Sequence, residues 1–150
     1  MARITSFIYC LGAERIQGPD GQAINANGIL TNITPEYVPG SFSFSIIFSM
    51  LGIEKSHHAL QIKFINPDGQ DIVNSNIIPI PFDQIVQNDP NGNLLPDDEK
   101  GLIMTMDLRN VIFKKDGEYH TEIFWDGIKL GEYKIYARGK NRIEWYRIYK

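Results

Sequence analysis

The side chains best suited to chemistry in this sequence are one cysteine and three histidines. Cys10 is the potential nucleophile, and His57, His58 and His120 are potential bases. A cysteine nucleophile needs a low pKa and a neighbouring base, whereas Cys10 lies within an apolar stretch where a thiol usually behaves as an inert small hydrophobe. No serine occurs in a Gly-x-Ser-x-Gly elbow. We therefore predict no catalytic residues, no small-molecule substrate and no enzymatic activity.

Metal ligands are the second possibility. His57 and His58 are adjacent, so on a strand they point to opposite faces, and no histidine or cysteine spacing matches a zinc site. The segment 82–100 carries enough oxygen donors for calcium, namely Asp89, Asn91, Asn93, Asp97, Asp98 and Glu99. It departs from the EF-hand pattern because Leu94 stands where glycine is needed. We predict no metal or cofactor, and keep calcium-dependent binding by this acidic loop as an alternative.

The C-terminal segment 139–150 combines cations with aromatic rings. Its predicted interface residues are Arg142, Trp145, Tyr146, Arg147 and Tyr149. Such residues are enriched in protein interface hot spots, and they also suit stacking and phosphate contacts with single-stranded nucleic acid. A third interpretation is an amphipathic terminal strand with Trp145 packed on the domain. We predict a protein partner or self-association, with single-stranded nucleic-acid binding as the alternative.

The element that organises the remaining chain is the stretch Ser41–Met50. Its aromatic and large aliphatic residues fall on every second position, and serines occupy most positions between them. Because successive strand side chains point to opposite faces, this pattern predicts a strand with an apolar side toward a core and a small polar side toward water.

Similar short strands follow one another along the chain. We predict about nine of them: 4–11, 24–33, 41–50, 57–65, 72–80, 101–108, 115–125, 128–138 and 142–150, the last being either strand or helix. The segment 82–100 is a long surface loop, and Asp126-Gly127 predicts a hairpin. Asp116-x-x-Tyr119 is placed as a tyrosine corner would be. Residues 1–150 thus form one all-β domain, an immunoglobulin-like or C2-like β-sandwich.

Composition excludes few classes of partner. The net charge of −3 neither demands nor forbids nucleic acid. No apolar run approaches the roughly 18 residues of a spanning helix, and Thr5 and Ser6 interrupt the short apolar start of the chain. Cys10 is the only cysteine. We therefore expect a cytoplasmic protein in a reducing compartment, without a membrane partner.

Two further stretches carry a resemblance to a known family. They are Ala59-Leu-Gln-Ile-Lys-Phe-Ile-Asn-Pro-Asp-Gly69 and Gly117-Glu-Tyr-His-Thr-Glu-Ile-Phe-Trp-Asp-Gly127, taken with the Phe-x-Phe-x-Ile strand that begins at Phe42. Together they resemble an uncharacterised bacterial family of small β-sandwich proteins that is known only as a domain of unknown function. The resemblance covers residues 3 to 138. It implies the fold and a bacterial or phage origin, and it supplies no functional residues.

Overall fold

The chain folds into two layers of β-strands. The computed structural model describes residues 1–18, 21–83, 96, 99 and 101–141. The strands of these residues are β1 (Arg3–Gly18), β2 (Gly21–Ile29), β3 (Asn32–Ile33), β4 (Gly40–Leu51), β5 (His58–Ile65), β6 (Asp71–Asn74), β7 (Ile78–Ile80), β8 (Gly101–Phe113), β9 (Gly117–Trp125) and β10 (Ile128–Ala137). The predicted all-β sandwich is confirmed.

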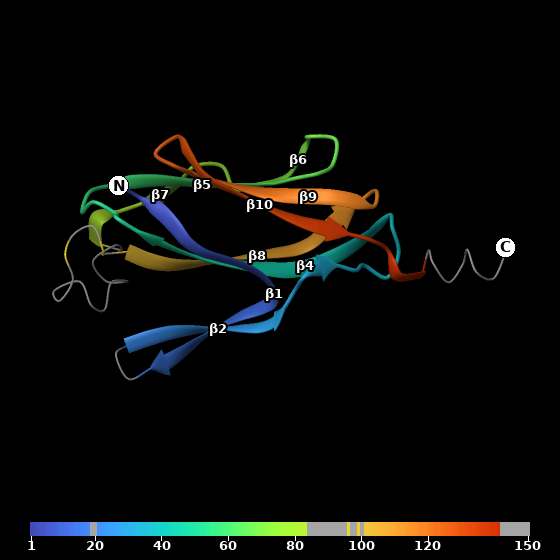
Figure 1. Cartoon of the computed structure of the whole chain (residues 1–150), viewed down its shortest axis with the longest axis horizontal. Helices are drawn as coiled ribbons and strands as arrows, with labels where there is room; N and C mark the ends of the chain where they lie inside the picture. Colours follow the sequence, from blue (N-terminus) through green and yellow to red (C-terminus); the bar gives the residue numbers. More distant parts are fainter. Residues whose placement is uncertain (19–20, 84–95, 97–98, 100, 142–150) are drawn as a thin grey trace.

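The sheets differ in size. The first has the order β2-β1-β4-β8, and the second has the order β3-β10-β9-β5-β6, with β7 also paired to β5. Figure 1 shows the two layers lying one over the other, with β4 and β8 beneath β5, β9 and β10. Every pairing between the described strands is antiparallel except the short parallel contact between β3 and β10. The predicted strand 72–80 is two strands, β6 and β7, because both fold back onto β5.

Aromatic rings fill the space between the sheets. Phe44 and Phe48 are fully buried, as the two-residue periodicity of β4 predicted. The ring of Phe44 lies 5.2 Å from that of Phe64, which comes from the opposite sheet. Phe113 and Tyr119 complete this cluster with centroids 4.9 Å apart. Such offset and edge-to-face contacts add to the large apolar area that each ring buries.

The other face of β4 is less exposed than its serines suggested. The prediction of a polar side toward water is wrong for Ser45, which is fully buried and donates a hydrogen bond of 2.6 Å to Asp107 Oδ1. Ile47, on the same face, is also buried. The physical reason is position: β4 lies between β1 and β8, so the side chains of both neighbours cover its small residues.

The first strand continues beyond its predicted end at Leu11. Its residues up to Cys10 pair with β4, Cys10 also pairs with β2, and Gly12 to Gly18 pair with β2 alone. The β1–β2 hairpin therefore extends away from both layers, as Figure 1 shows. Both faces of a two-stranded ribbon can meet solvent, so its sequence need not alternate, and the pattern hid its length. The predicted strand 24–33 likewise divides into the end of β2 and β3.

Two predicted local structures are confirmed in the second sheet. Asp126 and Gly127 both have positive φ, 51° and 79°, as the tight turn of the β9–β10 hairpin requires. The Tyr119 hydroxyl donates to the backbone carbonyl of Lys115 at 2.7 Å, which is the hydrogen bond of a tyrosine corner. Such corners occur in immunoglobulin-like sandwiches.

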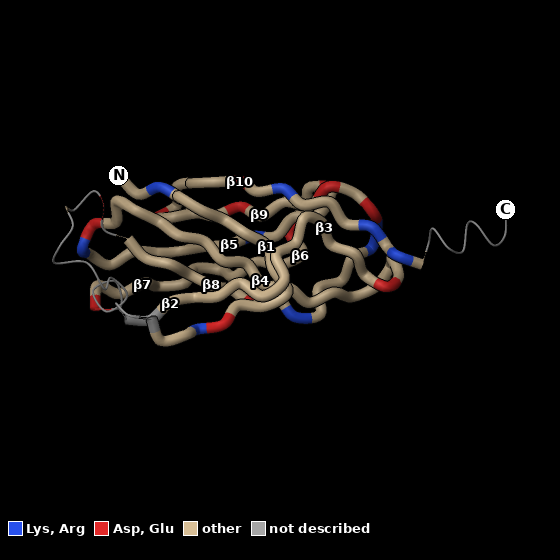
Figure 2. The backbone as a smooth tube through the Cα atoms, turned by 60° about the horizontal axis from the view of Figure 1, so that its bottom comes forward, with Lys and Arg blue, Asp and Glu red and all other residues tan. Residues whose placement is uncertain are grey.

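The distribution of charge is mixed. Figure 2 shows acidic and basic residues interspersed along the strands and turns, without a large region of one sign. Among the described residues, no helix has both the length and the apolar character needed to cross a membrane.

Candidate functional site

The interface predicted from sequence lies outside the described residues. This applies to Arg142, Trp145, Tyr146, Arg147 and Tyr149. It applies equally to the acidic loop, of which only Pro96 and Glu99 are described between positions 84 and 100. Protein binding through the tail, nucleic-acid binding through the tail and calcium binding by the loop therefore stay predictions.

Cys10 was predicted to be an inert thiol within an apolar strand, and the structure shows where its side chain lies. The side chain is fully buried, and its Sγ lies 3.3 Å from the carbonyl oxygen of Gly12. Burial raises the pKa of the Cys10 thiol, an effect that the contact with Gly12 only partly offsets. A buried, protonated thiol is a poor nucleophile.

His57 and His58 have different neighbours. His57 Nδ1 accepts a hydrogen bond from the backbone N–H of Phe82 at 3.2 Å. The His58 ring stacks on Trp125 with centroids 4.7 Å apart, and its Nδ1 lies 2.6 Å from Asp126 Oδ2. His58 thus joins the start of β5 to the β9–β10 turn.

Ser56, His58 and Asp126 lie in the order of a nucleophile, a base and an orienting acid. Ser56 Oγ is 3.2 Å from His58 Nε2. That nitrogen, however, is closer to the backbone carbonyl of Glu54, at 2.7 Å, and a carbonyl can only accept. His58 Nε2 therefore carries a proton and has no lone pair with which to deprotonate Ser56. In this geometry the hydrogen bonds of Ser56, His58 and Asp126 stabilise the loop before β5 and link it to the β9–β10 turn.

The hydrogen bonds around Asp126 also affect its acidity. Burial raises the pKa of its carboxyl group, but the hydrogen bond from His58, the backbone N–H of Ala59 and the charge of His58 together outweigh burial and lower it below 3.8. The Ala59 N–H donates to Asp126 Oδ1 at 2.9 Å. The ionised carboxylate is therefore part of the folded structure.

A groove lies between the two sheets of the described structure, and we call it the β6–β8 groove. It has a volume of about 420 Å³ and lies where the edge strand of each sheet meets the other. Ile72 and Val73 contribute from β6, and Val111 and Ile112 contribute from β8. These side chains give the groove an apolar floor, and Ile112 is 52% exposed.

A β-bulge shapes one wall of this groove. Phe42 pairs with Val111 and Phe44 with Leu108, so Ser43 alone opposes both Arg109 and Asn110. Asn110 has a φ of 53°, and its backbone N–H donates to Ser43 Oγ at 2.9 Å. A bulge re-aims side chains and interrupts regular pairing at a strand edge. Here it brings Arg109 and Asn110 to the groove on successive positions.

The rim of the groove is basic although the whole chain is acidic. Its charged lining residues are three cations, Arg109, Lys114 and Lys115, and one carboxylate, Asp68. Lys115 Nζ binds Asp68 Oδ1 at 2.7 Å, which closes one end of the groove across the sheets. Lys114 has no ion-pair partner among the described residues, and Arg109 reaches Asp107 only at 3.5 Å. The groove therefore presents positive charge to a ligand.

The tyrosine corner fixes the backbone beside the basic residues of this rim. Tyr119 lines the groove, is 1% exposed and holds the carbonyl of Lys115. On the other side, Asn66 Oδ1 accepts from the backbone N–H groups of Asp68 and Gln70, at 3.0 and 2.9 Å, and so fixes the β5–β6 turn. Both walls are thus held by hydrogen bonds within their own loops.

A second hollow of about 410 Å³ lies between β1 and β10. Phe7 and Tyr133, which line it, stack on each other with centroids 4.1 Å apart. Its two charged lining residues, Glu132 and Lys134, are of opposite sign. This balance favours no class of charged ligand, so the β6–β8 groove is the stronger candidate.

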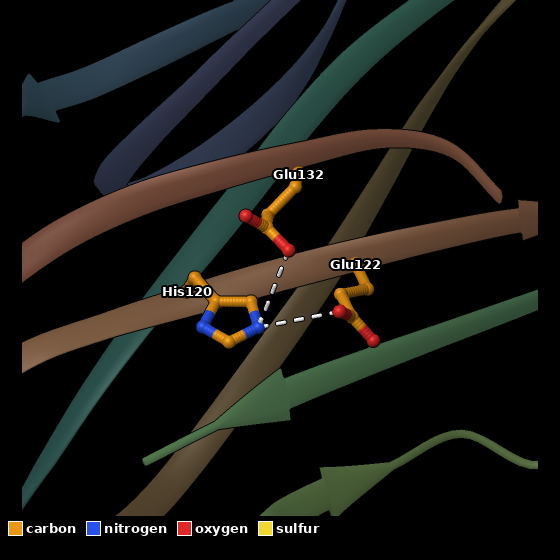
Figure 3. A group of neighbouring side chains, drawn as sticks. All are labelled: His120, Glu122 and Glu132. Carbon is orange, nitrogen blue, oxygen red and sulfur yellow. Dashed lines mark hydrogen bonds and ion pairs between the residues drawn. The ribbon is translucent and has the colours of Figure 1, made fainter. Parts of the chain in front are cut away.

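His120 lies in a polar cluster on the outer face of the second sheet. Its Nε2 is 3.3 Å from Glu122 Oε2 and 3.7 Å from Glu132 Oε1 (Figure 3). Lys129 Nζ binds the same two carboxylates at 2.9 and 2.7 Å. Sequence reasoning missed this cluster, although two signals could have shown it: His120-x-Glu122 puts both side chains on one face, and the Asp126-Gly127 hairpin brings β10 alongside.

The groove was also missed, because its residues come from two stretches that lie far apart in the chain, 66–73 and 109–119. Of the groove, only the tyrosine corner was recognised from sequence as a local structure, and the stretch that ends at Gly69 was noted only for the family resemblance. Arg109 and Lys114 do not belong to any sequence motif that predicts a site. The signal that unites them is the juxtaposition of two sheet edges, which no local spacing encodes.

Comparison with solved structures finds distant similarities. The chain is similar to an immunoglobulin-like protein from Pseudomonas aeruginosa, with 14% identity and a TM-score of 0.40 over 92% of this chain and 97% of that one. It is also similar to the alkylpurine DNA glycosylase AlkC of Pseudomonas fluorescens bound to DNA containing an abasic site analogue. That match has 9% identity and a TM-score of 0.36, over 72% of this chain and 27% of that one.

Comparison by sequence gives a family. No curated protein matches the chain significantly. A family model matches residues 8–138, close to the range 3 to 138 over which the resemblance was predicted, and it likewise ends before the basic-aromatic tail. The chain belongs to the family of unknown function DUF6941.

Proposed function

We propose that this protein is a non-enzymatic binding module that acts through protein–protein contacts, and that the β6–β8 groove receives an extended, acidic segment of a partner. The observation that carries the proposal is the combination of an apolar floor, a basic rim and an edge strand in one hollow. Each of these features selects a different property of the ligand.

The edge strand selects an extended backbone. Among the described residues β8 pairs only with β4, so the other edge of β8 has backbone groups available for a further strand. Peptides recognised by strand addition gain affinity from such main-chain hydrogen bonds and specificity from pockets for alternate side chains. The bulge at Arg109 and Asn110 interrupts regular pairing where the groove begins, so a segment lying in the groove would pair with β8 beyond the bulge, at Val111 and Ile112.

The floor and rim select the side chains. An extended segment presents alternate residues to opposite sides, so apolar residues can meet Ile72 and Ile112 while acidic residues meet Arg109 and Lys114. Complementary charge increases the association rate and selects against basic partners. The module would work in the cytoplasm, as the single cysteine predicted.

The proposal is tested with a fluorescein-labelled peptide of alternating Glu and Val, by fluorescence anisotropy at low and high salt. We expect salt-sensitive binding, because exposed charges are screened within about 10 Å at 0.1 M salt. The double variant Arg109→Glu/Lys114→Glu should bind at least about tenfold more weakly, since it replaces two attractive charges by repulsive ones.

Two controls make the result specific. A Lys-Val peptide of the same length should not bind. The variant Lys134→Glu reverses a charge on the outer face of the second sheet and should keep wild-type affinity. Equal binding of both peptides, unchanged affinity in the Arg109/Lys114 variant, or preference for an oligo-dT strand over the acidic peptide would each contradict the proposal.

A further inference from the structure

We propose that His120, Glu122 and Glu132 form a zinc-binding site on the outer face of the second sheet, in which Lys129 is a built-in competitor that Zn²⁺ displaces. The proposal is independent of the β6–β8 groove, because the two sites share no residue.

The distances between the ligand atoms suit a tetrahedral ion. Zn²⁺ binds histidine nitrogen and carboxylate oxygen at about 2.0–2.2 Å, which places tetrahedral ligands roughly 3.3–3.6 Å apart. His120 Nε2 lies 3.3 Å from Glu122 Oε2 and 3.7 Å from Glu132 Oε1, and all three ligand atoms fall within 4.8 Å of one another. Small side-chain rotations would therefore complete the set, leaving the fourth position to water.

The backbone holds these ligands in place. His120 and Glu122 are two residues apart on β9, so they share a face, and Glu122 is the direct cross-strand partner of Glu132 on β10. Figure 3 shows the three side chains converging above these two strands. Ligands carried on paired strands keep their spacing better than ligands on a loop.

The same β9–β10 register favours a cation between Glu122 and Glu132. Two carboxylates directly opposite each other repel, and Glu122 has a side chain only 17% exposed, so solvent screens it poorly. Lys129 supplies that cation, because its ammonium group bridges both carboxylates. Its own side chain is 41% exposed. Because exposed ion pairs contribute little to stability, the ammonium can swing into solvent when a divalent ion takes its place.

Replacement by Zn²⁺ also improves the balance of charge and donors. One ammonium carries a single charge against two carboxylates, and it can only donate a hydrogen bond to an imidazole lone pair rather than coordinate it. Zn²⁺ carries two charges and accepts that lone pair as well as both carboxylates. The three residue types present are thus better matched to the ion than to lysine.

The test is isothermal titration of Zn²⁺ into the full-length protein, with Co²⁺ absorption spectra as a second readout of tetrahedral coordination. We expect one site. Glu132→Gln should weaken binding at least about tenfold because it removes a charged ligand. Lys129→Met should tighten binding several-fold because it removes the competitor, an effect that a merely structural role for Lys129 does not predict.

Matched controls separate direct competition from general charge. Lys134→Met removes the same charge from the same face of β10 and should change affinity less than Lys129→Met. His57→Asn removes a histidine elsewhere and should have no effect. The proposal is overturned if wild-type protein takes up no Zn²⁺, if Glu132→Gln binds as tightly as wild type, or if Lys129→Met fails to increase affinity.

Discussion

The hydroxyl group of Tyr9 forms a polar connection across the core, and its removal gives a sharp prediction. Tyr9 Oη of β1 lies 2.7 Å from Thr121 Oγ1 of β9 and 2.7 Å from the backbone carbonyl of Tyr133 in β10. Tyr9 and Thr121 are 6% and 1% exposed. Burial raises the pKa of Tyr9 well above its ordinary value of 10.0, although hydrogen bonding to Thr121 opposes this shift. The phenol is therefore a neutral donor.

The direction of each hydrogen bond follows from its partners. The Tyr133 carbonyl can only accept, so Tyr9 gives its proton there, and the Thr121 hydroxyl must donate to Tyr9 Oη. The variant Tyr9→Phe consequently leaves two buried groups without a partner. Thr121→Val removes one donor and keeps the hydrogen bond from Tyr9 to Tyr133. The two substitutions should therefore have unequal effects.

The magnitudes follow from the cost of unpaired buried groups. A hydrogen bond contributes about 1 kcal/mol net, and an orphaned buried partner costs about 1–3 kcal/mol. We expect Tyr9→Phe to lower the free energy of unfolding by about 2–3 kcal/mol and Thr121→Val by about 1 kcal/mol. In the double variant no hydroxyl is left unpaired at Thr121, so it should be about 1 kcal/mol more stable than the sum of the single effects predicts.

The measurement is urea unfolding followed by tryptophan fluorescence, together with thermal melting. A loss of 1 kcal/mol corresponds to about 2–4 °C for a domain of this size, so Tyr9→Phe should lower the melting temperature by about 4–12 °C. Tyr37→Phe is the control, because Tyr37 is 64% exposed. Equal losses of stability in Thr121→Val and Tyr9→Phe, or additive effects of the two substitutions, would refute this assignment of donors and acceptors.

Two further predictions concern the loops. Because the pKa of Asp126 is lowered below 3.8 in the folded protein, its ionisation stabilises the fold above that pH and the contribution is lost as pH falls through the lowered value. Asp126→Asn should therefore flatten the acid side of a urea-midpoint-against-pH curve, and an unchanged slope below pH 4 would contradict this. Tyr119→Phe removes the hydrogen bond to the Lys115 carbonyl and should cost about 1 kcal/mol in urea unfolding. The same variant should weaken binding of the Glu-Val peptide, since the basic rim loses its support; full affinity would show that the corner serves stability alone.

The sequence was informative wherever a short stretch carries its own physical constraint. Alternation along β4 predicted that Phe44 and Phe48 face the core, because a strand places every second side chain on one side. The Asp126-Gly127 turn was equally readable, since few residues accept positive φ at two successive positions. The corner at Tyr119 followed from its offset to the preceding loop.

The tertiary structure decided which strands pair and what lies at their edges. The burial of Ser45 follows from the central position of β4, and the meeting of Glu122 with Glu132 follows from the β9–β10 register. The groove exists because β6 and β8 both end their sheets on the same side, with Arg109 turned toward it by a bulge. Alternation specifies a face without specifying a neighbour, so contacts between distant segments emerge only when the two sheets pack together.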